Sequence, residues 1–341
     1  MPIAVDFGSR ALHIVQGKNK GQKVDIQKAV IEPIANGLIQ DGIIREMSGI
    51  EVALRNALKK HGIFDRNCFA TINGNHIYTR DLAIPRAKPK IMQDVVSFEV
   101  QSSMGSNKDV AVEFVLSKQP VTDRDDMVNV RASALQMEVV NDYFKLLKNC
   151  HLKPAGLDIH SNAIVKLLAG REINGKMMKE GTATLILDIG GVTSSAYIFR
   201  NGEVLYSRII PIGGLEIERY VQKFNELQAG GQQMFIEKID LSLDSIRKSP
   251  DLADAIRPIV TTINDGVQRL LQYMGSRMQN ERVNQIYLCG RTAAFSGLDR
   301  TLSETFGIQT ETIEKMGQVE LASGIPIAPF VNAIGALIRL V

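Results

Sequence analysis

One stretch, from Thr182 to Pro211, constrains the fold of this chain more than any other. An apolar run from Leu185 to Leu187 ends at Asp188, and Gly190-Gly191 then imposes a tight turn before strand character resumes. Because glycine has no Cβ, such a turn can bring several backbone N–H groups close to a phosphate, while the aspartate can hold the accompanying cation through water. The pattern therefore predicts a phosphate-binding β-hairpin.

The start of the chain repeats this arrangement. Residues 3–7 read as an apolar strand that carries Asp6, Gly8 begins the turn, and strands over residues 11–16 and 23–32 follow. One such turn alone is most often an ordinary hairpin. Two copies indicate an internal duplication, and two hairpins that face each other across a cleft can grip a nucleoside triphosphate from both sides.

Length and composition agree with a duplicated protein. The chain has 341 residues, of which 45% are hydrophobic, so it can bury a large core. We expect two lobes, because single cores rarely grow beyond about 250 to 300 residues. The net charge is only +3 and the basic residues are spread out, which argues against a nucleic-acid partner. Three cysteines without metal-ligand spacing predict buried thiols in a reducing compartment.

Five segments together resemble the nucleotide site of the actin-like ATPases. They are VDFGS in the first turn, LDIGG in the second, the later IPIGG, the segment IYLCGRTAAFSGL, and FVNAIGALI near the end. The extra region from about Ile84 to Lys153 makes the chain most similar to the PilM family of type IV pilus assembly. The FtsA family of cell division is the nearest alternative, but the sequence up to Val341 lacks the basic amphipathic tail expected of FtsA.

This resemblance implies the fold class and the domains. We expect an α/β protein with the actin-like, ribonuclease H-like duplicated, two-lobed fold and an inserted small α+β subdomain. The first lobe then includes residues 1–84 and 154–170, and the inserted subdomain of the FtsA/PilM type includes residues 85–153. The second lobe includes residues 171–341, with a C-terminal helix that could return to the first lobe.

Periodicity gives more detail around the inserted region. A turn at Gly74-Asn75 predicts a hairpin between two strands, over residues 68–73 and 76–84. The insert itself reads as a helix, two strands and a helix that form one compact unit without a catalytic constellation, over residues 91–103, 109–116, 127–135 and 138–150.

The resemblance also implies a site for ATP and Mg²⁺. Asp6 and Asp188 are expected to hold the metal, through water. Asp158, at the crossing between lobes, could position a water or the cation, and the alternative is a hinge carboxylate with local hydrogen bonds. The residues expected to bind nucleotide are Asp6, Gly8, Ser9, Arg10, Asp188, Gly190, Gly191, Thr193, Gly213, Gly214, Glu237, Gly290, Arg291 and Thr292.

The chain departs from the family pattern in three places. His13 stands where relatives commonly have a lysine, and Arg10 could supply that charge. Arg291 stands where a second glycine is usual, and it could stack on the base, pair with a phosphate or fill the pocket. Glu237 is retained from an Ala-Glu-x-x-Lys pattern whose lysine is lost. These departures predict weaker binding or turnover of ATP than in the family.

The function implied by the resemblance is assembly rather than metabolism. We expect a cytoplasmic protein, at most a slow ATPase, that is recruited to the inner face of the cytoplasmic membrane without inserting into it. Its expected partner is the N-terminal cytoplasmic peptide of a PilN-like inner-membrane protein, and other pilus assembly proteins could also bind. Two alternatives stay open: a degenerate scaffold resembling GspL of type II secretion or FtsA, and a small-molecule kinase.

Overall fold

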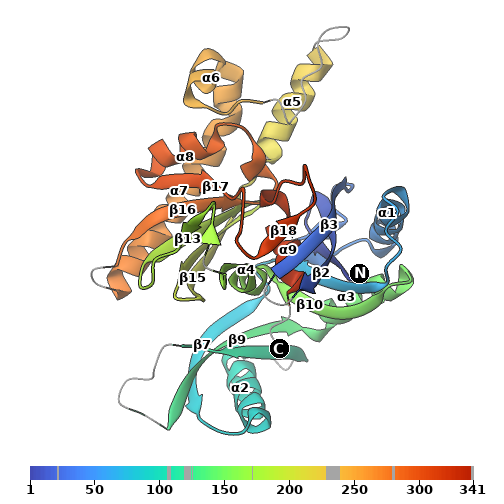
Figure 1. The fold of residues 1–341 in the computed structure, drawn as a ribbon, viewed down its shortest axis with the longest axis vertical. Coiled ribbons are helices and arrows are strands. Elements are labelled where there is room, and N and C mark those ends of the chain that lie inside the picture. Colours follow the sequence, from blue (N-terminus) through green and yellow to red (C-terminus); the bar gives the residue numbers. More distant parts are fainter. Residues whose placement is uncertain are drawn as a thin grey trace.

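The computed structural model describes residues 1–20, 23–105, 109–118, 124, 126–170, 172–227, 239–278 and 281–338. It consists of two sheet-based lobes and a smaller unit at the bottom of Figure 1. The first lobe is built on the N-terminal sheet and the second lobe on the sheet that contains residues 183–210. Glu237 lies outside the described residues.

The first lobe contains a six-stranded sheet in the order β10-β6-β1-β2-β3-β18. β1 and β2 are antiparallel, as are β2 and β3, whereas β6 is parallel to both β1 and β10. β18 comes from the C-terminal part of the chain and pairs parallel with β3. The bounds are β1 Ile3–Phe7, β2 Ala11–Lys20, β3 Lys23–Pro33, β6 Asn67–Ile72, β10 Lys153–Ile159 and β18 Val319–Leu321.

The second lobe repeats this topology in a five-stranded sheet of order β15-β14-β13-β16-β17. β15, β14 and β13 are antiparallel neighbours, and β16 pairs parallel with both β13 and β17. This strand order and these directions match those of β3-β2-β1-β6-β10 in the first lobe. The predicted duplication is therefore present in the strand order. The bounds are β13 Ala183–Ile189, β14 Ser194–Arg200, β15 Glu203–Ile210, β16 Val283–Cys289 and β17 Gln309–Thr312.

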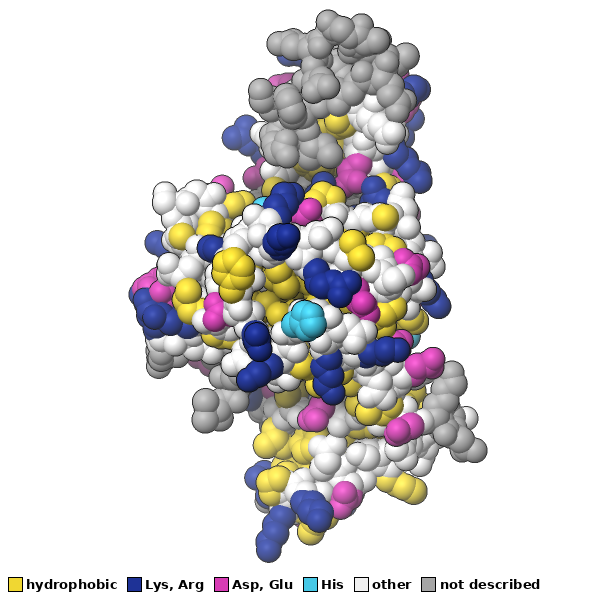
Figure 2. All heavy atoms as spheres, turned by 90° about the vertical axis from the view of Figure 1, so that its right-hand side faces the viewer, with side chains coloured by type: hydrophobic (Ala, Val, Ile, Leu, Met, Phe, Trp, Pro, Cys, Tyr) yellow, Lys and Arg dark blue, Asp and Glu magenta, His cyan; other side chains and the backbone are white. Residues whose placement is uncertain are grey.

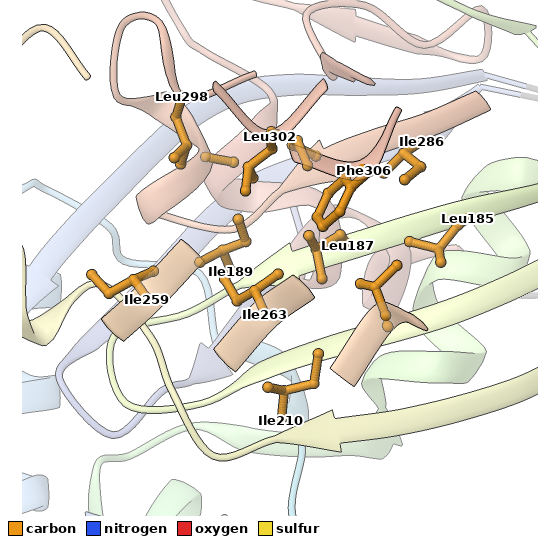
Figure 3. Close-up of a cluster of buried hydrophobic side chains, with 14 of the residues drawn as sticks. Leu185, Leu187, Ile189, Ile210, Ile259, Ile263, Ile286, Leu298, Leu302 and Phe306 are labelled. Carbon is orange, nitrogen blue, oxygen red and sulfur yellow. The ribbon is translucent and has the colours of Figure 1, made fainter. Parts of the chain in front are cut away.

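Helices cover the outer face of each sheet. α1 (Met47–Lys60) and α3 (Met137–Asn149) pack on the first sheet, where Ile3, Val5 and Phe7 of β1 enter their core. On the second lobe, α7 (Pro250–Arg277) and α8 (Leu298–Phe306) bury Leu185, Leu187 and Ile189 of β13, as Figure 3 shows. α5 (Leu215–Leu227) contributes to the same core, and the short helix α6 spans Leu243–Lys248.

Two further helices fill the layer between the sheets. α4 (His160–Leu168) and α9 (Val331–Leu337) share one core with both lobes, including Ala4 of β1 and Ile186 of β13. Side chains alternate between the two faces of a strand, so Asp6 lies on the same face as Ala4, and Asp188 on the same face as Ile186. Both aspartates therefore face the inner layer.

The smaller unit combines three strands and one helix. Its sheet has the order β7-β9-β8, and α2 (Pro89–Met104) covers it with Met92, Val96 and Val100. α3 packs instead on the first lobe, where the hydroxyl of Tyr143 donates to the carbonyl of Gly42 (3.0 Å). The division at residues 85 and 153 stays a prediction. The strand bounds are β7 Tyr78–Pro85, β8 Val110–Leu116 and β9 Met127–Gln136.

The predicted hairpin at Gly74-Asn75 is wrong. The strands on either side exist, but β6 joins the first sheet and β7 the small sheet. Asn75 is held instead by Asp41: the backbone N–H and the side-chain amide of Asn75 both donate to the Asp41 carboxylate. The turn thus redirects the chain from one sheet to another. Two short strand pairs complete the structure: β4 Ile39–Gln40 with β5 Ile43–Ile44, and β11 Glu172–Ile173 with β12 Lys176–Met177.

The surface carries a mixture of charges. In the view of Figure 2, Lys and Arg side chains lie interspersed with acidic and apolar ones over the central part of the molecule. Within the described ranges, no helix is long and apolar enough to cross a membrane.

Candidate functional site

The two glycine turns have the same local structure. Asp6 is the penultimate residue of β1 and Asp188 the penultimate residue of β13. In each turn, a glycine two residues after the aspartate donates its N–H to a backbone carbonyl. Gly8 donates to the carbonyl of Ala11 and Gly190 to that of Thr193, both at 3.1 Å. The predicted pair of aspartate-bearing hairpins is therefore present, one from each lobe.

Strand register places a row of polar side chains beside each aspartate. On the first sheet, Asp6 is paired with His13 of β2 and Thr71 of β6, and Thr71 is paired in turn with Asp158 of β10. On the second sheet Asp188 is paired with Ser195. Directly paired residues share one face of a sheet, so all of these side chains face the inner layer. The amide of Asn73 joins the lobes there by donating to Ser195 (2.7 Å).

A histidine that the sequence reasoning did not single out lies between the two aspartates. His160 is the first residue of α4, and its Nε2 donates to Oδ1 of Asp6 at 2.7 Å. Its Nδ1 lies 3.3 Å from Oδ2 of Asp188. Asn332, on the other inner helix, donates its amide to the same Asp188 oxygen at 2.8 Å. His160 therefore joins the aspartates of the two lobes at this point.

The charges follow from these contacts. Burial would lower the pKa of His160, but the charges of Asp6 and Asp188 and the hydrogen bonds to them raise it to about 10. Burial would raise the pKa of Asp6, yet His160 outweighs it and holds that pKa below its ordinary value. Burial lowers the pKa of His13. At neutral pH the site thus contains charged His160, charged Asp6 and neutral His13.

The remaining glycines assemble around the turn of the second lobe. Gly214 and Leu215 donate their N–H groups to the carbonyls of Gly190 (2.9 Å) and Gly191 (2.8 Å), which fastens the start of α5 to this turn. The hydroxyl of Thr292 also donates to Gly190, at 2.9 Å. A Cβ on Gly213 would lie 2.5 Å from the Gly190 carbonyl oxygen, so no larger residue fits there.

Gly290 and Arg291 follow β16 at the edge of this assembly. Gly290 has a φ of +86°, and a Cβ there would lie 2.4 Å from a carboxylate oxygen of Asp188. Nη1 of Arg291 lies 3.0 Å from Oε1 of Glu218 in α5, and Nη2 of Arg10, from the first lobe, lies 3.4 Å from Oε2 of the same carboxylate. Arg10 also packs against Gly191, where a Cβ would meet its Cγ at 2.7 Å. The two turns are therefore in contact.

Several buried polar atoms, at this junction and in the inner layer beside it, have no hydrogen-bond partner in the protein. Buried side-chain atoms without a hydrogen bond in the described structure include Nε of Arg10, both ring nitrogens of His13, Oγ1 of Thr71 and Oδ1 of Asn332. Buried polar groups normally find partners. The N–H groups of Ser9 and Gly191, in the two turns, also have no acceptor among the described residues. The junction and the inner layer beside it therefore present unused donors and acceptors to a ligand.

Asp158 has a different environment from the other predicted residues. Its carboxylate pairs with the buried Nζ of Lys166 at 2.5 Å, and it also accepts from the Asn162 side chain (2.7 Å) and the Ile159 N–H (2.9 Å). Lys166 donates further to the carbonyl of Ile338, just after α9. Asp158 thus makes the local hydrogen bonds expected of a hinge carboxylate, the alternative to a role in positioning water or the cation.

The structure brings the predicted site residues that it describes around two adjoining centres, with Asp158 at the side of the first and paired with Lys166. One is the layer containing Asp6 and Asp188, and the other is the junction of the two turns. The MgATP-site prediction for these residues stays a prediction. In the described ranges, no three His, Cys, Asp or Glu side chains are arranged as direct ligands of a metal ion.

Sequence reasoning missed His160, Asn332 and Glu218. A weak signal existed for each: His160 directly follows the strand of Asp158, Asn332 lies within the FVNAIGALI segment, and Glu218 lies four residues after Gly214. None belongs to a spacing that indicates a site without knowledge of how α4, α5 and α9 pack.

Comparisons with known proteins agree with this architecture. A family model described as type IV pilus assembly protein PilM matches residues 4–330. The cell division protein FtsA of Bacillus subtilis (strain 168) is 24% identical over 236 residues, which are 64% of this chain and 53% of FtsA. The chain thus matches about half the length of this curated relative.

Two solved structures share the fold over 98% of this chain. The PilM-PilN type IV pilus biogenesis complex has a TM-score of 0.76 with 21% identity and 97% of its chain covered. The ethanolamine utilization protein EutJ from Carboxydothermus hydrogenoformans has a TM-score of 0.54 with 13% identity and 88% covered. The predicted two-lobed actin-like fold is confirmed.

The position of His160 predicts a pH-dependent contribution to stability. Its pKa rises from about 6.5 in the unfolded chain to about 10 in the folded protein. The stabilisation is therefore complete below pH 6.5 and is lost as the pH rises through 10. His160→Gln should lower the melting temperature by several degrees at pH 6.5, and the difference from wild type should shrink steadily toward pH 10.

Thermal unfolding at several pH values checks this expectation. The matched control is His151→Asn, at an exposed histidine whose φ of 61° asparagine tolerates. A His160→Gln difference that stays constant or grows with pH would contradict the charge assignment.

Proposed function

The chain belongs to the family of the type IV pilus assembly protein PilM, and on that premise we propose that it is a nucleotide-binding assembly protein of a type IV pilus machine. MgATP binds between the lobes and thereby sets the affinity for a membrane partner. One observation carries the proposal: two equivalent aspartate-bearing glycine turns, one from each lobe, meet beside an inner layer, and buried polar atoms at this place lack hydrogen-bond partners.

The residues at the junction fit the proposed ligand. Phosphates carry negative charge and accept hydrogen bonds, and the unused N–H groups of Ser9 and Gly191 together with the guanidinium of Arg10 supply donors and positive charge. Asp6 and Asp188 would hold Mg²⁺ through water, the usual manner in which this ion keeps part of its hydration shell. The bound cation would neutralise phosphate charge.

His160 sets a condition on cation binding. It already supplies positive charge to both aspartates, and a second cation in the same buried layer would be repelled. Binding of Mg²⁺ therefore requires His160 to turn away from the two aspartates. Because His160 contacts an aspartate of each lobe, its displacement would release one of the contacts that hold the lobes together, which supports a role in gating an assembly.

Slow chemistry is part of the proposal. The predicted candidate for positioning a water, Asp158, is neutralised by a buried lysine. His160 is protonated at neutral pH and so cannot accept a proton from water there. We therefore place binding, rather than turnover, at the centre of this function.

The proposed partner is the N-terminal cytoplasmic peptide of a PilN-like inner-membrane protein, which would bring this protein to the inner face of the cytoplasmic membrane. Support comes from the small unit, whose helix α2 and edge strand β8 expose large apolar side chains: Ile91, Phe98, Val115 and Leu116. Exposed apolar side chains of this size favour protein contacts. A solved relative is described as a complex of PilM with PilN.

A second candidate function is a scaffold that needs no nucleotide. The observation that favours it is internal pairing of charges: His160 pairs with both aspartates, and Glu218 pairs with both Arg10 and Arg291. Such a protein would bind its membrane partner in one fixed state.

Thermal stability with MgATP distinguishes the two functions. At a hundred times its dissociation constant, a ligand of the native state adds about 2.7 kcal/mol, so MgATP should raise the melting temperature of the wild type clearly. Asp188→Asn removes the charge that faces the cation and should abolish the shift.

The control for this measurement is Asp265→Asn, which removes an exposed carboxylate from α7 and should leave the shift intact. An equal shift in Asp188→Asn would contradict the site, and no shift in the folded wild type would favour the scaffold.

Partner binding gives a second test. Phe98 is 69% exposed on α2, and Phe98→Ala should weaken binding of the PilN-like N-terminal peptide by about tenfold, as expected of an aromatic anchor. Fluorescence anisotropy with the labelled peptide measures the dissociation constant. Phe64→Ala, at a phenylalanine that is 83% exposed on the first lobe, is the control. Equal dissociation constants for Phe98→Ala and wild type would place the peptide elsewhere.

A further inference from the structure

Two arginines from opposite lobes converge on a single carboxylate. Arg10 lies in the turn after β1, Arg291 follows β16, and each approaches a different oxygen of Glu218, at 3.4 and 3.0 Å. The Glu218 side chain is only 16% exposed. A carboxylate held by two guanidinium groups in this way occupies a position built for an anion.

The surroundings of Glu218 are those of the candidate phosphate site. Glu218 lies in the first turn of α5, whose start is fastened to Gly190 and Gly191 by two backbone hydrogen bonds. The positive end of a helix dipole favours an anion there. Arg10 packs directly on Gly191 and keeps its buried Nε without a partner. The anion position therefore adjoins both glycine turns.

We propose that Glu218 is an internal competitor of the nucleotide: its carboxylate occupies the anion position between Arg10 and Arg291, and a phosphate of MgATP displaces it. The inference rests on the proposed nucleotide site and adds a regulator to it. Because Arg10 and Arg291 belong to different lobes, Glu218 also holds the lobes together until a nucleotide replaces it. Removal of its charge leaves both arginines available to phosphate without opening a cavity.

The same helix offers a matched control. Glu216 lies two residues earlier in the same turn and pairs with Arg219 at 2.6 Å, with its side chain 38% exposed. Glu216→Gln and Glu218→Gln change the net charge of the protein equally and break one ion-paired carboxylate each. A general electrostatic effect on a polyanionic ligand would therefore appear in both variants, and displacement of an internal anion only in Glu218→Gln.

The experiment is isothermal titration of MgATP into wild type, Glu218→Gln and Glu216→Gln, each shown to be folded by circular dichroism. Glu218→Gln should bind MgATP about fivefold more tightly than wild type, at the upper end of what an ion pair at a protein surface contributes. Glu216→Gln should stay within twofold of wild type.

Three results would overturn the inference. An unchanged or weaker affinity in folded Glu218→Gln, with MgATP bound by wild type, would mean that Glu218 does not compete and would leave the nucleotide site standing. Equal gains in both variants would assign the effect to net charge. Absence of binding in wild type and Glu218→Gln alike would remove the nucleotide site itself, and the competitor with it.

Discussion

Two carboxylates buried in one layer between two sheets are the constraint on which this structure depends. An ionised carboxylate withdrawn from water is costly unless a cation and hydrogen-bond donors accompany it. Asp6 and Asp188 enter the inner layer from different lobes, and the helices α4 and α9 supply His160 and Asn332 between them. The contact of one cation with both aspartates consequently depends on closure of the lobes, because separating the sheets would remove His160 from one carboxylate or the other.

A second pair of opposite charges lies beside the first. Arg10 and Arg291 hold Glu218 where the two glycine turns meet. The inner layer therefore contains an internal cation where magnesium would bind, and the junction of the turns contains an internal anion where phosphate would bind. A nucleotide with its cation carries both signs at once. In our account, exchange of internal for external ions converts ligand binding into a change in how the lobes are held, and this is the property that an assembly protein without rapid chemistry can use.

Periodicity and local turn chemistry explain which features could be predicted from the sequence. Alternation in β1 and β13 places Asp6 and Asp188 on the inner faces, and the repeated Asp-x-Gly turn reveals the duplication before any packing is known. His160 and Glu218 could not be found in this way. Asp6, a partner of His160, is more than 150 residues away in the chain. Arg10, a partner of Glu218, belongs to the other lobe. Only the placement of α4 between the sheets, and of α5 against the second turn, gives these residues a role.

The same distinction accounts for the prediction that failed. Gly74-Asn75 has turn chemistry, and the sequence shows strands on both sides, yet local signals do not specify which sheet each strand joins. Hydrogen bonds from Asn75 to Asp41 fix the turn in a form that sends β7 into the small sheet. In α3, likewise, the apolar face is evident from the sequence, but its partner on the first lobe is set by contacts such as that of Tyr143 with Phe7.

The most direct test of this account is an experimental structure of the protein with Mg²⁺ and a non-hydrolysable ATP analogue. We expect the phosphates to lie between the turns at Gly8 and Gly190, against the guanidinium groups of Arg10 and Arg291, with Glu218 displaced and His160 no longer bridging Asp6 and Asp188. An analogue bound outside this layer, or bound within it while His160 and Glu218 keep their present partners, would contradict the claim that the internal ions and the nucleotide share one site.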